Sequence, residues 1–537
     1  MLKARLLPHI YFAYFFLVLA AAFGLLYAMQ LLGFGTQLIR PDLVRSLHIS
    51  LMLYGFVPLM MTLLPFALFD KEGVMKEEGV WYLERFLYLW YIFLVFLIFS
   101  LLAGDTRGLP FYDFPYELNA ILALAGIFYI IAIFKTIKGY EVKPLWVRVS
   151  LVLVIASPFA LLLLMNPRYG QVEKMLLGPH GDNTLGMSFA LLAIYYLAIK
   201  LASPRTVFST RRHILWQIPL GFYLLSVLYR SFIGSLSYNA EWLLQYLTLL
   251  YIPVLYIWWK DAGLKVRKNL TLFISIAAFL FADVEGNILF IPWLRALFHR
   301  NDLVVGHAHI AVGIGLLFLA LSIIEPFVKV SARRALYLTG MLFLMALVLS
   351  ISGIEQAGFA VMHTELMWAL RVFFGLMFLA GLLFVRSLFS VKRVQGFFRS
   401  LRSIDLYNLA GFLSDGVGGI LLLLFGSTLY ALIDQPFVGG YQTIVFGFVT
   451  AVGLVHLLGF LLPAQAHPFA LATVILRLVT AAGFFALYKA GVFEWIAYAI
   501  SGIDLLFVLL YLIFLKDPYE KTHTSQPSFD CSDIRRS

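Results

Sequence analysis

Two histidines, His307 and His309, stand one residue apart at the start of a long apolar stretch. Residues two apart on an α-helix point about 200° from each other, so the two imidazoles face opposite sides of one helix. Histidine is costly inside a bilayer, and the neutral imidazole nitrogen is the commonest metal ligand. The pair therefore predicts one helix that supplies a ligand to each of two metal centres.

The elements that must position these histidines are membrane-spanning helices. Hydrophobic residues make up 62% of the chain and charged residues only 13%, and the mean hydropathy is +0.90. Apolar stretches of roughly 20 residues, long enough to cross a bilayer, recur about sixteen times. They lie near residues 10–33, 45–69, 81–103, 117–136, 146–165, 183–203, 212–233, 242–259, 270–291, 303–326, 335–353, 365–386, 408–432, 441–463, 468–488 and 493–515. The sequence therefore predicts an all-α, polytopic membrane protein in contact with lipid.

The basic residues predict how the chain is oriented. The net charge is +11, and Lys and Arg collect in alternate loops. These loops are 135–148, 200–212, 260–268, 329–334 and 392–402. All of them fall on one side of the membrane if the N-terminus is cytoplasmic, as the positive-inside rule requires. We therefore expect a prokaryotic-type plasma membrane location with both termini in the cytoplasm, and no nucleic-acid partner.

Both ends of the chain carry further signals. The segment Met1–Arg5 leads directly into an apolar stretch without a small-residue cleavage site, which predicts a first membrane anchor rather than a removed signal peptide. The single cysteine, Cys531, lies in the polar tail 516–537. A lone cysteine there excludes an internal disulfide, an iron–sulfur cluster and a haem attached through Cys-x-x-Cys-His.

The expected topology brings several candidate site positions to one depth in the outer leaflet. They stand at the outer ends of the second, sixth, seventh and tenth apolar stretches. These residues are His48, His180, Asp182, Gly234, Ser235, His307 and His309. Hydrogen bonding between packed helices is the alternative to metal ligation for the histidines among them.

The residues around His48 and the His-x-His pair carry a specific resemblance. The chain resembles the catalytic subunit of the haem–copper oxidase superfamily, most of all its C-family (cbb-type) oxidases and the nitric oxide reductases. The resemblance is carried by Arg45–Ser50, by Glu285-Gly286 and by Leu297–Asp302 at the family's spacing from the pair. It covers about residues 10–390. It implies a twelve-helix core over 1–390, with additional helices over 391–515 and a polar cytoplasmic tail over 516–537.

The resemblance also implies roles for the histidines. His48 and His309 would hold a low-spin haem b, and His307 would hold a high-spin haem b. Glu285 would lie near the high-spin haem. We expect its carboxylate either to orient the His307 ring through the ring's free N–H or to serve only as a hydrogen-bonded structural group.

The chain departs from the family at the second metal. Asp182 stands where the family has a helix VI histidine, and Gly234 and Ser235 stand where it has a histidine pair. Copper prefers imidazole or thiolate, whereas carboxylate and hydroxyl suit harder ions. Copper is therefore predicted to be absent, and non-haem iron stays open, with Asp182, His180 and Glu241 as the nearby candidate ligands.

Two functions follow from this pattern. The first is a respiratory-chain oxidoreductase that takes electrons through the bis-histidine haem to a second haem, which binds or reduces oxygen or nitric oxide. The second is a non-catalytic membrane haem protein that relays electrons or senses gas. The electron donor would be cytochrome c or quinol, and a small partner subunit is expected.

The remaining polar residues carry no specific chemical signal. The last four apolar stretches are expected to lack an ionisable pair at the membrane midplane and to pack against a partner subunit. Arg295 and Arg300 would pair with haem propionates or anchor the surface. The histidines expected to hydrogen-bond at the membrane interface are His9, His213, His363, His456 and His467.

Overall fold

The computed structural model confirms the predicted fold class. It describes residues 2–36, 39–107, 113–139, 148–149, 151–152, 155–156, 181–204, 214–298, 301–359, 364–383, 402–432, 435–492 and 495–514. Within these ranges every regular element is a helix. Fourteen helices in the described part of the chain are long and apolar enough to cross a membrane. The protein is an all-α polytopic membrane protein.

Two of the sixteen expected spans are not among these fourteen helices. The span near 146–165 lies mostly outside the described residues. The span near 212–233 corresponds to α9, Gln217–Phe232, a helix of 16 residues that follows the short 3₁₀ turn Ile214–Trp216. A helix of that length rises about 24 Å, which is short of a hydrocarbon core of about 30 Å.

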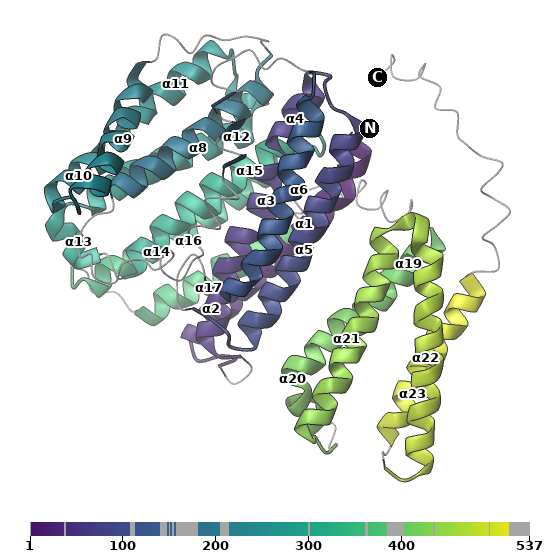
Figure 1. Ribbon diagram of the computed structural model, residues 1–537. Coiled ribbons are helices and arrows are strands. Elements are labelled where there is room, and N and C mark those ends of the chain that lie inside the picture. Colours follow the sequence, from purple (N-terminus) through teal and green to yellow (C-terminus); the bar gives the residue numbers. More distant parts are fainter. Residues whose placement is uncertain are drawn as a thin grey trace. The chain divides into compact units, whose positions relative to one another are not determined.

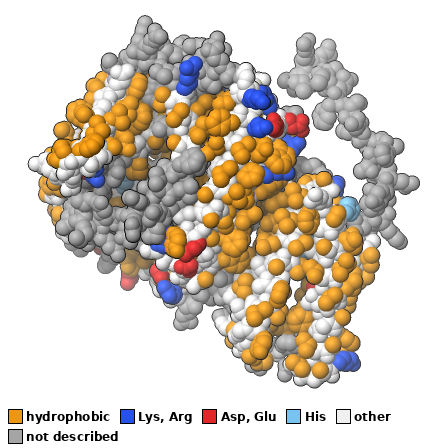
Figure 2. Space-filling model, viewed as in Figure 1, with side chains coloured by type: hydrophobic (Ala, Val, Ile, Leu, Met, Phe, Trp, Pro, Cys, Tyr) orange, Lys and Arg blue, Asp and Glu red, His pale blue; other side chains and the backbone are white. Residues whose placement is uncertain are grey.

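The surface of the described helices is suited to lipid. Hydrophobic side chains cover most of the described face in Figure 2. Large apolar side chains are widely exposed, among them Phe232 at 83%, Tyr441 at 80% and Phe448 at 69%. A water-soluble protein rarely exposes contiguous apolar surface on this scale, so these faces are expected to contact the acyl chains of the bilayer.

The chain folds as two compact units, Met1–Ser390 and Val391–Ser537. The elements of the first unit are α1 (Leu2–Leu31), α2 (Pro41–Tyr54), α3 (Phe56–Thr62), α4 (Leu64–Lys71), α5 (Glu77–Leu102), η1 (Tyr116–Leu118), α6 (Asn119–Ile137), α8 (Gly181–Ala202), η2 (Ile214–Trp216), α9 (Gln217–Phe232), α10 (Tyr238–Tyr246), η3 (Leu247–Leu250), α11 (Tyr251–Asp261), η4 (Val266–Lys268), α12 (Leu270–Leu289), α13 (Pro292–Phe298), α14 (Asp302–Ala308), η5 (His309–Leu316), α15 (Leu317–Ile324), α16 (Ala332–Gln356) and α17 (Thr364–Leu383). Figure 1 shows α1, α2, α3, α5 and α6 as neighbours within this unit.

The second span is broken where α2 gives way to α3. Proline at position 58 removes a backbone N–H, so the carbonyl of Tyr54 loses its helical donor. The indole Nε1 of Trp90 on α5 donates to that carbonyl at 2.7 Å. The break therefore leaves its backbone satisfied, and it separates the outer segment that carries His48 from the rest of the span.

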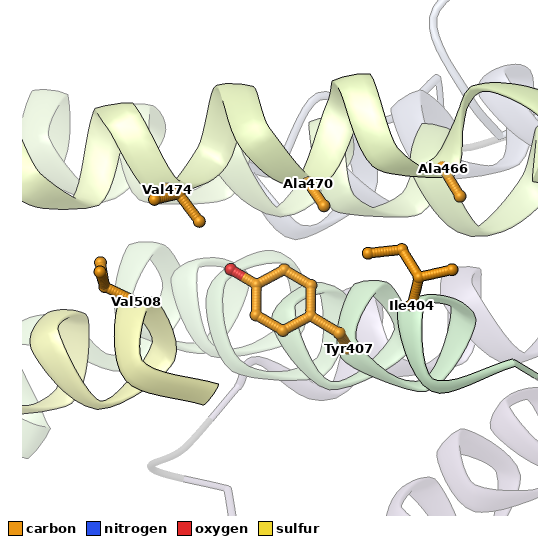
Figure 3. Close-up of a cluster of buried hydrophobic side chains, with 6 residues drawn as sticks. All are labelled: Ile404, Tyr407, Ala466, Ala470, Val474 and Val508. Atoms are coloured by element: carbon orange, nitrogen blue, oxygen red, sulfur yellow. The ribbon is translucent and has the colours of Figure 1, made fainter. Parts of the chain in front are cut away.

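The second unit contains the helices after residue 390. They are α19 (Ser403–Gly411), the π-helix η6 (Phe412–Val417), α20 (Gly418–Leu432), α21 (Gly439–Leu461), η7 (Pro463–Gln465), α22 (Ala466–Lys489) and α23 (Trp495–Phe514). Ile404 and Tyr407 of α19 face Ala466, Ala470 and Val474 of α22, with Val508 of α23 beside them (Figure 3). This apolar cluster joins three helices of the unit.

The expectation that these last spans lack a midplane ion pair is wrong. Arg477 of α22 is 2% exposed and pairs with Asp415 of η6 and Asp504 of α23. The three residues lie 27 and 62 positions apart in sequence, so only helix packing brings them together. The apolar sequence around each of them concealed the pairing.

Candidate functional site

His48 is fixed by the helix beside it. The ring lies on α2, which packs on α1, and its Nδ1 is 2.8 Å from the carbonyl oxygen of Ala20. A carbonyl only accepts, so Nδ1–H is the donor and Nε2 keeps the lone pair with which a neutral imidazole binds a metal. Gly24 makes the space, because a Cβ there would come within 2.7 Å of the ring.

His309 is fixed in the same way, by its own helix. Its Nδ1 is 2.8 Å from the carbonyl oxygen of Val305, one turn earlier. Nδ1–H is again the donor, and Nε2 again keeps the lone pair. The two histidines, from helices far apart in sequence, are therefore presented in the same tautomer.

The His48 and His309 rings lie at a distance from each other that suits a shared metal. Their centroids are 6.3 Å apart and their planes differ by 23°. A metal bonded at about 2 Å to one nitrogen of each ring would hold the ring centres about 6 Å apart. The donor set, the tautomers and the spacing all fit the axial ligation of a haem.

The helix that carries His309 changes its winding at this residue. It is α-helical over Asp302–Ala308 and π-helical over His309–Leu316. The wider turn is accommodated by α12, where Ser275 donates from Oγ to the carbonyl of Gly315 at 2.7 Å. Single π-helical turns occur often at functional sites.

His307 faces a different helix from His309. Its Nδ1 lies 3.2 Å from Oε2 of Glu285 on α12, and both side chains are partly exposed, at 26% and 21%. A Cβ at Gly286 would come within 3.3 Å of the His307 ring. With Nδ1–H donating to the carboxylate, Nε2 of His307 is the nitrogen with the lone pair. The structure thus brings Glu285 and His307 together, and the glycine beside Glu285 permits the approach.

A buried polar cluster adjoins Glu285 and was missed by the sequence analysis. Thr248 donates to Asp283 Oδ1 at 2.6 Å, and Asn287 donates to Thr248 Oγ1 at 3.1 Å. Asp283 Oδ2, Asn287 Oδ1 and the hydroxyl of Tyr251 are buried without a hydrogen-bond partner among the described residues. An aspartate two residues before Glu285 inside an apolar stretch was the available signal, since intramembrane carboxylates mark functional sites by default.

Arg371 on α17 was also missed. Its side chain is buried, lies within electrostatic range of both His48 and His309 and approaches Asp302 at 4.0 Å. It stacks 5.7 Å above the ring of Tyr27. An arginine inside the apolar stretch 365–386 was the signal. A buried cation beside the two rings could pair with the acidic groups of a bound cofactor.

The expected second-metal candidates are only partly described. His180 lies outside the described residues, and Asp182 belongs to the first turn of α8 with its side chain outside them. Glu241 is buried and paired with Arg230. Gly234 follows the end of α9 with φ of 127°. Among the described residues, no group of three or more His, Cys, Asp or Glu side chains is arranged to hold a metal ion.

The arginines and histidines for which the sequence predicted surface or interfacial roles differ in their contacts. Arg295 lies 5.8 Å above the ring of Phe290, and Arg300, His213 and His363 lie outside the described residues. His9 is buried with its Nδ1 3.2 Å from the hydroxyl of Tyr91. His456 is fully buried and its Nδ1 lies 3.3 Å from Oδ1 of Asn408, so it makes the expected kind of contact, a hydrogen bond.

Comparison with known proteins adds no relative: no protein-family model matches the chain, and no curated protein matches it at a significant level.

Proposed function

We propose that the protein is a membrane haem oxidoreductase of a respiratory chain, which takes electrons from cytochrome c or quinol and reduces oxygen or nitric oxide. His48 and His309 would hold one haem b, and His307 would hold a second. A haem supplies one-electron redox chemistry and, where one axial position stays open, a binding position for a diatomic gas. We further propose that both termini are cytoplasmic, as the basic loops favour.

The single observation that carries this proposal is the His48–His309 pair. Ring stacking alone tolerates centroid distances of 4.5–7 Å, but it does not require that both Nδ1 atoms be tied to carbonyls. Here both are, at 2.8 Å each. Each Nε2 is thereby kept as an electron-pair donor, which is what axial ligation needs.

Glu285 would act through His307. Its carboxylate accepts from Nδ1–H, which fixes the ring orientation and makes the opposite nitrogen a stronger donor. Arg371 would act on the other pair, because a fixed positive charge near His48 and His309 favours an added electron over its loss. The midpoint potentials of the two haems would therefore be shifted by charges of opposite sign, a carboxylate beside His307 and a guanidinium beside His48 and His309.

A second candidate function is a non-catalytic haem protein that relays electrons or senses gas. It is favoured by Gly234 and Ser235, which cannot supply the imidazoles of a copper site, and by the pairing of Glu241 with Arg230. Metal analysis and turnover separate the two functions. We expect copper well below one per chain in haem-loaded protein. One tightly held copper per chain with brisk oxygen consumption would contradict the assignment of Asp182, Gly234 and Ser235 to the ligand positions.

The proposal is tested by the absorption spectrum of the dithionite-reduced protein. We expect a sharp low-spin α-band in the wild type and its loss in His48→Ala and in His309→Ala. His467→Ala, a histidine of the second unit, is the matched control and should keep the band. A band that survives both ligand substitutions would overturn the proposal.

A further inference from the structure

The second unit contains a group of charges that the proposed function does not use. Arg477 on α22 donates from one terminal nitrogen to Asp504 Oδ1 at 2.7 Å and from the other to Asp415 Oδ2. Its guanidinium also lies 3.9 Å above the ring of Phe507. We call Asp415, Arg477 and Asp504 the charge triad.

The charge triad lies deep in the membrane. Arg477 is near the middle of the span Pro463–Lys489, Asp504 near the middle of Trp495–Leu512, and Asp415 well inside Ser403–Leu423. Arg477 is 2% exposed, and the side chains of Asp415 and Asp504 are 11% and 13% exposed. Ionisable side chains at this depth are costly and mark ion or proton sites by default.

The charges of the triad do not balance. One guanidinium faces two carboxylates, so a fully ionised triad carries one net negative charge in a nonaqueous interior. An unpaired buried charge costs several kcal/mol, and such a group commonly takes up a proton instead. We propose that the charge triad is a proton-binding site, in which Asp504 holds one exchangeable proton at the middle of the membrane.

Hydrogen bonding favours Asp504 over Asp415 as the proton holder. Asp415 accepts from Arg477 at one oxygen and from Ser414 Oγ at the other, at 3.0 Å. Hydrogen bonds to a carboxylate stabilise its charged form. Asp504 accepts from Arg477 at Oδ1 alone among the described hydrogen bonds. The proton therefore belongs on Asp504, because fewer hydrogen bonds stabilise its charged form.

A second buried polar group faces the same interior. His456 of α21 is fully buried. Its Nδ1 lies within hydrogen-bonding distance of Asn408, and its Nε2 has no hydrogen-bond partner among the described residues. His456 lies 6.4 Å from the ring of Phe507, which also contacts Arg477. A cation on His456 would lie near Arg477 and be repelled, so the proton is expected on a carboxylate. Among the other titratable groups, Tyr407 of α19 lies within electrostatic range of Arg477 and Asp415. Tyr511 of α23 packs against Tyr407, with ring centroids 5.5 Å apart.

Close helix contacts hold the triad in place. A Cβ at Gly453 of α21 would come within 1.9 Å of the backbone nitrogen of Gly416, so α21 and η6 meet backbone to backbone beside Asp415. A Cβ at Gly411 would come within 2.3 Å of His456 Nε2. Asp415 itself sits in a π-helical turn, a feature frequent at functional sites. The aspartate is thus fixed toward Arg477 by packing that leaves little room for another arrangement.

A metal cation fits the triad less well than a proton. Hard cations need about six oxygen ligands at short distance. Both oxygens of Asp415 and one of Asp504 already accept hydrogen bonds. A proton needs a single oxygen, so it is the ligand that the arrangement can take.

The experiment is infrared difference spectroscopy of the full-length protein in lipid, between alkaline and mildly acidic buffer, in H₂O and D₂O. We expect the carbonyl stretch of one protonated carboxylic acid, shifted in D₂O, to be lost in Asp504→Asn and kept in Asp42→Asn, the exposed control. Asp415→Asn should shift the band without removing it. A band absent from the wild type, or retained in Asp504→Asn, would overturn the proposal.

Three further results bear on the proposal. Loss of the band in Asp415→Asn alone would overturn the assignment to Asp504. Because asparagine matches a protonated aspartate in shape and charge, Asp504→Asn should fold and elute as the wild type does, and its misfolding would contradict a proton at this position. A band that disappears when Na⁺ is raised at constant pH would contradict a site that takes a proton alone. None of these readouts depends on haem.

Discussion

His48 and His309 of the first unit and the charge triad of the second unit all place polar side chains inside the membrane. The two sets differ in how the hydrogen-bonding capacity of these side chains is used. His48 and His309 use one ring nitrogen each for a backbone carbonyl and keep the other available. The charge triad satisfies most of its atoms internally. Groups that each keep a lone pair suit an added metal cofactor, whereas groups that bind one another suit nothing larger than a proton.

Arg477→Gln tests the charge triad and should produce the largest effect of the substitutions considered, a loss of stability. With Asp504 protonated, the substitution leaves the buried carboxylate of Asp415 without its cation, and breaking a buried pair in this way costs about 3–5 kcal/mol. The measurement is the free energy of unfolding in a mixed-detergent titration. The low-spin haem band of the first unit should persist in the protein that remains folded. Lys489→Gln, at an exposed position of the same helix, is the control. Equal free energies of unfolding for the two variants would contradict the pairing of Arg477 with a buried carboxylate.

Gly24→Ala tests the histidine side of the comparison. The added methyl group would lie 2.7 Å from the His48 ring, and overpacking of this kind costs roughly 1–3 kcal/mol. We expect the ring to be displaced and the haem content of the low-spin site to fall severalfold, as measured by the pyridine haemochrome assay. Gly340→Ala is the control, because a Cβ there meets nothing within 4 Å. Full haem loading in Gly24→Ala would mean that the observed ring position is not the ligating one.

Arg371→Gln sharpens the comparison between the two haem positions. Loss of a buried positive charge disfavours the reduced state, so the midpoint potential of the His48/His309 haem should fall by tens of millivolts, where about 59 mV is a tenfold change in a one-electron equilibrium. Arg371→Lys keeps the charge and should restore most of the potential. Spectroelectrochemical titration measures both. An unchanged potential in Arg371→Gln would leave the arginine a structural role with Asp302.

Glu285→Gln should give the smallest shift, in the opposite direction. Glutamine keeps the size of the side chain but removes a negative charge 3.2 Å from His307, so the midpoint potential of the His307 haem should rise. The potential of the His48/His309 haem should stay nearly constant in the same titration. Two unchanged potentials with normal haem loading would reduce Glu285 to a hydrogen-bonding role.

The sequence predicted what depends on local pattern. Apolar stretches of sufficient length predicted the spans, and the two-residue spacing of His307 and His309 predicted different neighbours for them. The structure gives them different neighbours, Glu285 and His48. Such features follow from the geometry of one helix, which a sequence specifies directly.

The sequence did not predict what depends on packing between distant helices. Arg371 and Arg477 each stand alone in an apolar stretch, and Asp283 has only Glu285 beside it. The partners of all three come from other helices. The partner of Arg371 is 69 positions earlier in the chain, at Asp302. A single sequence shows the isolated charge but not the helix that will face it.

The most direct test of the central claim is the low-temperature electron paramagnetic resonance spectrum of the oxidised, haem-loaded protein. Two axial imidazoles with planes 23° apart should give the rhombic low-spin ferric signal of near-parallel ligand planes. That signal should be missing from His48→Ala and His309→Ala and present in His467→Ala. A haem-loaded wild type with no low-spin ferric signal, or a signal that survives both ligand substitutions, would contradict the account.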